Sequence, residues 1–359
     1  NVTRYGKSHI DRVLTGVNGL SINKTTQAIE VALTRQRIDQ TNEIWANQTT
    51  LNTALTTGLI KHDLVFGLEL LKESQLNLGT TTGSSSTATV MVNGQTLPVL
   101  SIVQNVYSPN SNQSLLVPYL TGADSDGSTT TTALYVFDTL FLTENLKFNL
   151  GLRADNYKVK TKAGALVTGG VGANVTKPSI AGYKVGDVVI SELEDDDTLL
   201  SWNAGLVFKP AANGSIYVAF ADAQTPPAGA NFVLSATAGN QANAELDPQQ
   251  TTTAELGTKW ELLNKRLNVS AAIYRTENDK QASVDAVTGV ANQEGKTRVD
   301  GIELAAVGQL TNFWQLTMSV GFMESEQLSQ SSKSSSTGVI TTSDGVRWTP
   351  DVTASVWTS

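Results

Sequence analysis

The stretch "ELGTKWELLNKRLNVSAAIYR", residues 255–275, decides between the fold classes open to this chain. On both sides of the short segment 263–265, apolar and polar residues alternate. The apolar positions are Leu256, Trp260, Leu262, Leu267, Val269, Ala271 and Ile273. Because successive side chains of a strand point to opposite faces, this pattern predicts two strands joined by a tight turn. The apolar face must then lie against the core of a soluble sandwich or against lipid.

Composition leaves both possibilities open. The chain has 359 residues, enough for two ordinary domains or one large all-β domain, and 40% of the residues are hydrophobic. No apolar run reaches the roughly 18 residues that indicate a membrane-spanning helix. A transmembrane barrel strand needs only about 9–11 residues and shows alternation, so a membrane barrel remains possible.

The charge and the residue counts exclude several kinds of site. The formal net charge is −8, which argues against nucleic acid as a partner because phosphates attract basic surfaces. The chain has no cysteine, so disulfides and thiolate metal sites are excluded. His9 and His62 are the only histidines, no catalytic constellation is recognisable, and we expect no enzyme activity. The acidic run "ELEDDD" (192–197) is interpreted as a solvated loop end, and neither a metal site nor a cofactor is expected.

The alternation recurs along the chain, and so does an order in the connections. Clear examples of alternation are "HDLVFGLEL" (62–70), "LKFNLGLRAD" (146–155), "SWNAGLVFK" (201–209) and "FWQLTMSVGF" (313–322). About thirteen segments fit period two better than helical spacing. Short connections are predicted near 60–61, 144–145, 210–214, 263–265 and 310–312. Between them lie long polar connections at about 77–131, 163–195, 223–248, 281–291 and 327–344.

This order predicts an all-β fold, an antiparallel transmembrane β-barrel of the outer-membrane type. Such barrels have short periplasmic turns at one rim and long extracellular loops at the other. The polar faces of the segments are charged enough for a hydrated lumen; they carry Lys147, Arg153, Asp155, Glu255, Lys259, Glu261 and Glu303. A passive porin and a non-transporting surface β-protein, such as an adhesin, remain as alternatives.

Several motifs resemble those of TonB-dependent outer-membrane receptors. "LDPQQTTTAELGTKW" (246–260) resembles the proline, spacer and Glu-Leu-Gly-x-Lys strand of that family. "GKTRVDGIELAAVGQLTNFWQLTMSVGFM" (295–323) is similar to the next hairpin of the family, with its Gly-Ile-Glu-Leu core. "FNLGLRADNY" (148–157) resembles the "GLRYD" strand, with Ala154 where an aromatic residue is usual. The resemblance extends from about residue 40 to the end of the sequence.

One loop resembles a narrower branch of the family. "TPPAGANFVLSATAGNQAN" (225–243) is similar to the loop of the ferric-catecholate, Fiu-like receptors. The resemblance implies a 22-stranded barrel closed by an N-terminal plug domain, of which residues 1–359 would form an interior part without the plug and the last strands. It also implies uptake of a ferric siderophore, with the iron held by the siderophore itself.

The resemblance further implies partners and a location. The receptor would lie in the bacterial outer membrane as a monomer, in contact with lipid and lipopolysaccharide. The TonB–ExbB–ExbD complex of the inner membrane would supply energy through the plug, which would shift between two states when ligand binds.

Two groups of residues are predicted to serve this function. Ferric catecholates are anionic and aromatic, so aromatic rings, amides and a guanidinium group suit them. The candidate ligand-binding residues are Phe232, Asn231, Gln224, Tyr107, Tyr119 and Arg153. The resemblance also places Glu255 and Glu303 on the barrel wall facing arginines of the plug. Since Leu256 and Ile302 are expected to point outward, both glutamates should point into the lumen.

Overall fold

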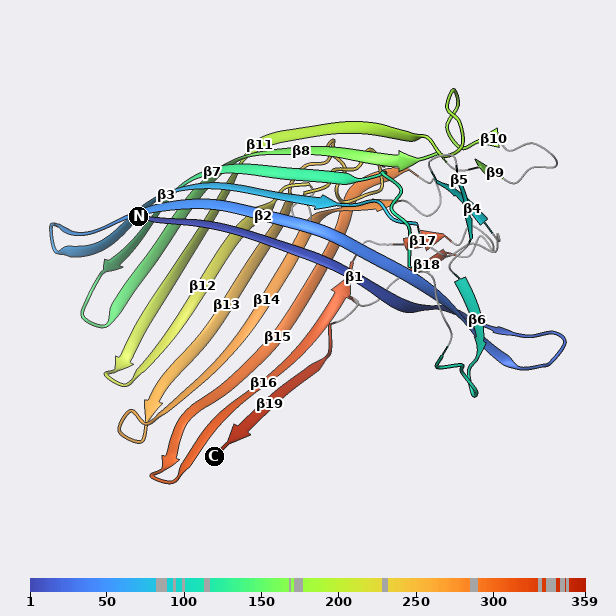
Figure 1. Ribbon diagram of the computed structural model, residues 1–359. Helices are drawn as coiled ribbons and strands as arrows, with labels where there is room; N and C mark the ends of the chain where they lie inside the picture. The colour runs from blue at the N-terminus through green and yellow to red at the C-terminus, as the bar shows by residue number, and fades with distance from the viewer. Residues whose placement is uncertain are drawn as a thin grey trace.

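The protein is one large antiparallel sheet with small satellite sheets at one end (Figure 1). The computed structural model describes residues 1–81, 89–92, 95–98, 101–112, 117–167, 169–170, 177–227, 232–284, 290–328, 331–333, 340–342, 346 and 349–359. The described residues contain no helix, and therefore none that could cross a membrane. The main sheet has 13 strands, one of which, β6 (Ser101–Asn105), lies inside the connection predicted at about 77–131.

The strands of the main sheet follow one another in chain order, with one addition. They are β1 (Val2–Ile22), β2 (Ile29–Thr57), β3 (Ile60–Asn77), β7 (Ser125–Phe141), β8 (Leu146–Leu166), β11 (Val188–Ala211), β12 (Gly214–Thr225), β13 (Gln249–Leu262), β14 (Leu267–Val284), β15 (Ala291–Thr311), β16 (Trp314–Gln327) and β19 (Val352–Thr358). The addition is β6 (Ser101–Asn105), which pairs with the outer end of β2.

Three two-stranded sheets lie in the long connections. They are β4 (Thr89–Val92) with β5 (Gln95–Pro98), β9 (Gly169–Gly170) with β10 (Lys177–Pro178), and β17 (Ser331–Lys333) with β18 (Ile340–Thr342). All three gather at the end of the main sheet opposite the short turns (Figure 1). The predicted alternation of short and long connections is therefore confirmed.

Several strands extend further from the short turns than the sequence predicted. β7 begins at Ser125 and β11 at Val188, inside segments that were expected to be loops. β8 pairs with β11 without interruption from Leu146 to Leu166. The hairpins therefore project well beyond the length that a membrane requires.

One row of directly opposite residues on neighbouring strands shows what the apolar face contacts. It crosses ten antiparallel strand pairs, from β2 to β19. Its members are Leu55, His62, Leu140, Phe148, Leu206, Val218, Leu256, Ile273, Ile302, Phe322 and Val352. All but His62 are apolar, and Val218, Leu256 and Ile273 keep about half of their surface exposed, at 51%, 48% and 51%. Such a belt of exposed apolar side chains is typical of a lipid-facing barrel wall.

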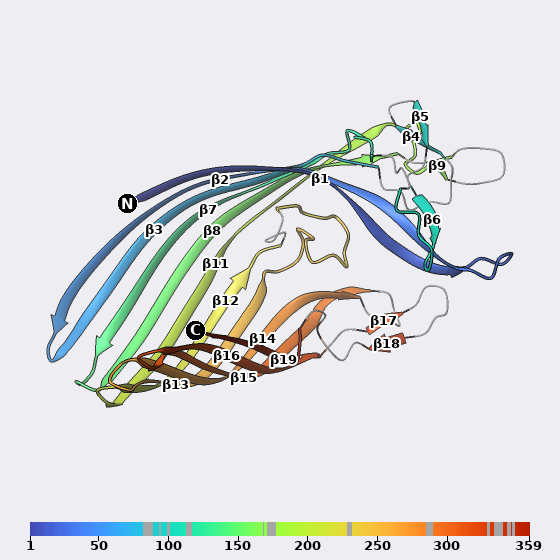
Figure 2. The same cartoon turned by 60° about the horizontal axis from the view of Figure 1, so that its bottom comes forward.

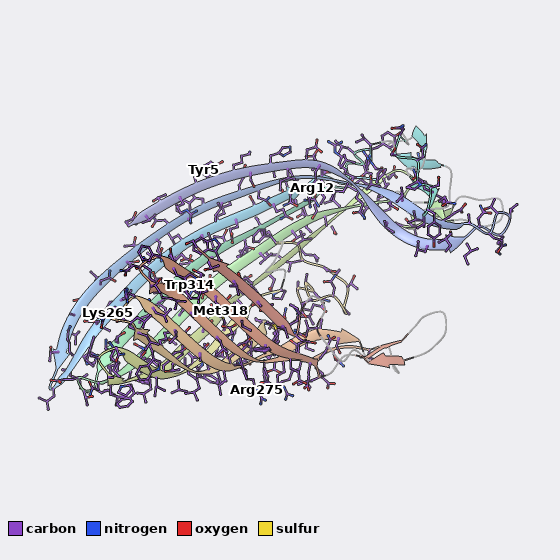
Figure 3. All side chains as sticks on the ribbon, turned by 90° about the horizontal axis from the view of Figure 1, so that it is seen from below. Tyr5, Arg12, Lys265, Arg275, Trp314 and Met318 are labelled. Atoms are coloured by element: carbon purple, nitrogen blue, oxygen red, sulfur yellow. The ribbon has the colours of Figure 1, made fainter. Side chains whose placement is uncertain are left out.

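The sheet curves so that this belt lies on its convex side. Figure 2 shows the strands bending around a common interior, as part of a barrel wall. In Figure 3, Tyr5 and Arg275 point away from that interior, and Arg275 belongs to the same face of β14 as Ile273. Residues next in sequence to a member of the outward row point to the other face of the sheet. Glu255, beside Leu256, and Glu303, beside Ile302, therefore face the lumen.

The belt ends where charged residues begin on the same outward face. On β8 the outward positions are apolar up to Ala154 and continue as Asn156 and Lys158. On the neighbouring β11 the change occurs between Leu200 and Asp196. Beyond this level the two strands stand outside the membrane.

His62 and Asp138 are polar exceptions on the outward face near the short turns. They come from the neighbouring strands β3 and β7, and His62 Nδ1 lies 2.7 Å from Asp138 Oδ2. This contact satisfies one oxygen of the carboxylate and lowers part of the cost of placing the two residues among leucines, while Asp138 Oδ1 is buried without a hydrogen-bond partner.

Candidate functional site

The lumen face of the wall carries functional side chains at two levels. The lower level lies within the membrane belt and includes Arg153, seven residues after the start of β8, and Glu255, seven residues before the end of β13. The upper level lies around Thr161 of β8, eight residues further out. At about 3.3 Å per residue, the two levels are roughly 26 Å apart along the strand.

The upper level is built by the connection between β12 and β13, which folds back onto the lumen face. Figure 2 shows this connection inside the curve of the sheet. Leu234 is buried, with 3% of its surface exposed, in a cluster with Tyr157, Val159 and Leu199. These three side chains belong to the inward faces of β8 and β11, so the connection packs against the wall instead of standing free above it.

Among the predicted ligand-binding residues, Phe232 and Tyr119 lie in anchored segments. Phe232 is half-buried and adopts a left-handed backbone conformation, with φ 58°. Its carbonyl oxygen accepts a hydrogen bond from Thr161 Oγ1 at 3.1 Å. Tyr119 is half-buried, and its backbone exchanges hydrogen bonds with Thr81.

The other predicted loop residues are placed differently. Tyr107 is 80% exposed beyond the end of β6. Gln224 pairs with Gln250 and lies on the same face of β12 as Phe220, which is the outward face. Asn231 lies outside the described residues. The structure thus separates Gln224 from the lumen, and the binding roles of Phe232, Tyr119 and Tyr107 stay predictions.

Arg153 is held by two carboxylates at the lower level. Its guanidinium donates to Asp155 at 2.7 Å and to Glu69 at 3.0 Å. It also lies over the ring of Tyr135, 5.6 Å from the centroid, in the geometry of a cation–π contact. Because its charge is already compensated, Arg153 is better suited to stiffen the wall than to hold an anion alone.

Glu255 and Glu303 form an acidic part of the wall at the same level. Glu255 accepts a hydrogen bond from the hydroxyl of Tyr217, and Glu303 lies beside Gly321 and Ala272 on the lumen face. The predicted inward orientation of both glutamates agrees with the register, since Leu256 and Ile302 belong to the outward row. Their contact with a plug stays a prediction.

A recurrent pair of an aromatic ring and a glycine lines the lumen, and sequence reasoning missed it. Tyr135 lies against Gly67, Tyr217 against Gly257, and Tyr274 against Gly301, each pair formed by directly opposite residues of neighbouring strands. A methyl group added to these glycines would come within 1.8, 2.4 and 2.4 Å of the respective ring. The glycines let the rings lie flat on the wall. The pairs become visible only when the strand register is known.

The acidic run 192–197, which was interpreted as a loop end, lies inside strand β11, and its two glutamates are paired with lysines. Its outward members are paired with lysines of β8: Glu192 with Lys162 at 2.8 Å, and Glu194 with Lys158 and Lys160. The lysine–carboxylate ladder, as we call Lys158, Lys160, Lys162, Glu192 and Glu194, lies on the outer surface beyond the belt. Among the described residues, no group of acidic and histidine side chains is arranged to hold a metal ion.

Comparison with known proteins places the wall in a family. Residues 3–359 match the family model "TonB dependent receptor-like, beta-barrel". "Catecholate siderophore receptor Fiu" of Escherichia coli O6:H1 is 35% identical over 326 residues, covering 88% of this chain and 40% of the relative. "Probable TonB-dependent siderophore receptor PiuA" of Acinetobacter baumannii is 30% identical over 220 residues, covering 61% of this chain and 27% of the relative.

A solved structure agrees with these relatives. The closed form of the ferric-catecholate import receptor Fiu from E. coli K12 superposes with a TM-score of 0.83 and 29% identity, over 99% of this chain and 48% of that one. The chain spans about 40% of the length of the Fiu relatives that it matches. The chain belongs to the β-barrel domain of the TonB-dependent receptors, which are outer-membrane proteins.

Proposed function

We propose that this chain forms a large part of the barrel wall of an outer-membrane receptor that imports a ferric siderophore of the catecholate class. The observation that carries the proposal is the 35% identity, over 88% of the chain, to a protein named a catecholate siderophore receptor. The wall supports the same reading, because it has an apolar outer belt and a polar lumen face with a loop folded into it.

In this proposal the upper level meets the ligand first. A ferric catecholate presents flat aromatic faces and negative charge, which aromatic side chains and hydrogen-bond donors can recognise. Phe232 and Tyr119 offer rings on anchored backbone, and Tyr107 offers an exposed ring in the first long connection. Iron remains bound by the siderophore throughout, so the wall supplies no metal ligand, no cofactor and no catalytic group.

The lower level would contact the plug of the complete receptor. Glu255 and Glu303 present carboxylates to the lumen at belt height, where a buried carboxylate requires a cationic partner. In the free wall, Tyr217 satisfies Glu255 in part. We expect plug arginines to complete the pairing, and coupling to TonB–ExbB–ExbD to act on the plug. Glu255→Arg with Glu303→Arg should impair uptake, and acidic replacement of the plug arginines should restore it.

The test is ligand binding by the full-length receptor in detergent, followed by tryptophan fluorescence. The ferric complex of catechol should quench saturably, whereas ferric acetohydroxamate, which lacks aromatic faces, should not. Quenching by both complexes would remove the catecholate assignment. Quenching by neither, together with an open single-channel conductance, would replace the receptor by a passive channel.

A further inference from the structure

Thr161 lies at the point where the connection between β12 and β13 meets the wall. Its side chain is buried, with 2% of the residue surface exposed. Its hydroxyl donates to the carbonyl oxygen of Phe232 at 3.1 Å and accepts from the amide of Leu234 at 2.8 Å. One hydroxyl therefore satisfies backbone groups on both sides of residue 233, so that the chain is held at this point by its backbone.

Gly127 completes the contact from the neighbouring strand. It is the direct cross-strand partner of Thr161. A methyl group at Gly127 would lie 2.1 Å from the carbonyl oxygen of Phe232, far inside van der Waals contact. Gly127 and Thr161 together form a notch in the wall that receives this carbonyl. We call these two residues the notch.

The backbone held by the notch is strained. Phe232 has φ 58°, a left-handed conformation that is unfavourable for a residue with a bulky side chain. Such a conformation persists only where surrounding contacts impose it. The hydrogen bonds of Thr161 and the burial of Leu234 supply those contacts.

The same connection is also fixed to the opposite part of the wall. Gln241 Oε1 accepts a hydrogen bond from the backbone amide of Ala282 on β14 at 2.5 Å. Asp247 pairs with Lys280 of β14 at 3.1 Å, and its amide donates to Gln293 of β15. Residues 232–247 therefore span the inner face between β8 and β14 and are attached at both ends.

We propose that the notch is a positioning device, which locks residues 232–247 against the lumen face as a fixed wall of the siderophore site. This inference rests on the proposed function, because it assigns the segment to the ligand. It goes beyond that function by naming Thr161 and Gly127, which contact no ligand themselves, as residues that set affinity. Phe232 is thereby presented in one orientation before ligand arrives, which reduces the ordering cost of binding.

The test compares Thr161→Val with Thr161→Ser in the full-length receptor. Valine keeps the shape but leaves the Phe232 carbonyl and the Leu234 amide without a partner, whereas serine keeps the hydroxyl. In the ligand-free receptor, hydrogen exchange of residues 232–247 should become faster in Thr161→Val and stay near the original rate in Thr161→Ser. Affinity for the ferric catechol complex should fall roughly tenfold in Thr161→Val and recover in Thr161→Ser, as expected for two lost hydrogen bonds.

Each outcome separates the two proposals. Unchanged exchange in Thr161→Val would overturn the notch as a lock. Faster exchange with unchanged affinity would show that the segment is no part of the ligand site and would overturn the inference while the receptor function stands. If the unaltered receptor does not bind the ferric catechol complex, the proposed function fails and the ligand role of the notch fails with it. Gly127→Ala, which obstructs the same carbonyl from the other strand, should reproduce both effects of Thr161→Val.

Discussion

At the scale of single residues, the wall depends on contacts between directly opposite side chains. Tyr135 shows this most clearly, because its ring covers Gly67 while its hydroxyl accepts a hydrogen bond from Gln48 at 2.8 Å. Arg153 lies over the exposed side of the same ring. The ring is thus held between the wall and a guanidinium, and its position fixes that of Arg153.

Gly67→Ala should therefore destabilise the barrel. The added methyl would lie 1.8 Å from Tyr135 Cζ, so the ring must leave the wall and lose its contacts with Gln48 and Arg153. We expect the free energy of unfolding to fall by about 1–3 kcal/mol, the usual cost of overpacking. Urea unfolding of the receptor in lipid vesicles measures this change.

Gly205→Ala is the matched control for this prediction. Gly205 also faces the lumen in a strand interior, but a methyl group there would meet its nearest neighbour at 3.4 Å, an ordinary contact. Alanine should be neutral or stabilising by up to about 1 kcal/mol. Equal losses in both variants would show that the Tyr135 ring is not held by Gly67.

The lysine–carboxylate ladder makes a prediction about pH. Hydrogen bonds from Lys158 and Lys160 hold the pKa of the Glu194 carboxyl below its usual value of 4.5. A lowered folded-state pKa gives a contribution that is present above pH 4.5 and is lost as the pH falls through the folded-state pKa. The pKa of Lys158 is raised above 10.5 by the hydrogen bond with Glu194, so its contribution is lost only as the pH rises through that higher value. The ladder is fully formed at neutral pH.

Carboxyl-carbon NMR of glutamate-labelled receptor tests this directly. Replacing Lys158 and Lys160 together by Gln should move the Glu194 pKa back towards 4.5. Lys162→Gln removes the partner of Glu192 instead and should leave the Glu194 titration nearly unchanged. A Glu194 titration that does not respond to the double replacement would contradict the assignment of these contacts.

At the scale of elements, the sequence predicted the strands well inside the belt and poorly beyond it. Between Leu146 and Ala154, one face of β8 meets lipid and the other meets the lumen, so the two faces differ in polarity and alternation is clear. Beyond Asn156 the outer face is also polar, and the alternation fades although the strand continues to Leu166. The same reason explains why alternation is weak in β1, whose outward positions include Lys7 and Asp11.

The sequence predicted the candidate site only where the orientation of a residue follows from the alternation within its own strand. The inward orientation of Glu255 and Glu303 follows from alternation within their own strands. The notch could not be predicted in this way. Thr161 contacts Phe232, which is 71 positions away in the sequence, and Gly127 lies beside Thr161 only because of the register between β7 and β8. Gln224 was predicted to bind ligand because it lies next to the proline-containing loop. In the structure it belongs to β12, four positions after Phe220, and its side chain therefore points outward on the same face as Phe220.

At the scale of the whole molecule, the outward row from Leu55 to Val352 makes the sheet a boundary between lipid and water. Each strand that the row crosses contributes one residue to it, and the next position along that strand faces the lumen. A soluble sandwich would instead cover such a row with a second sheet, leaving its residues buried. The exposure of 51% at Val218 and 48% at Leu256 fits a surface whose remaining contacts are made by lipid.

Neighbouring residues of β12 should therefore differ sharply in their tolerance of charge. Val218→Lys places an ammonium group in the hydrocarbon layer and should cost about 2–4 kcal/mol of unfolding free energy in lipid vesicles. Ala219→Lys places the same group in the lumen, directly opposite Glu255, where water and a carboxylate can accommodate it. Urea unfolding in vesicles should show the large loss only for Val218→Lys. Equal losses would mean that both faces of β12 have the same surroundings, and a larger loss for Ala219→Lys would mean that the apolar row faces inward and that the assignment of the two faces is reversed.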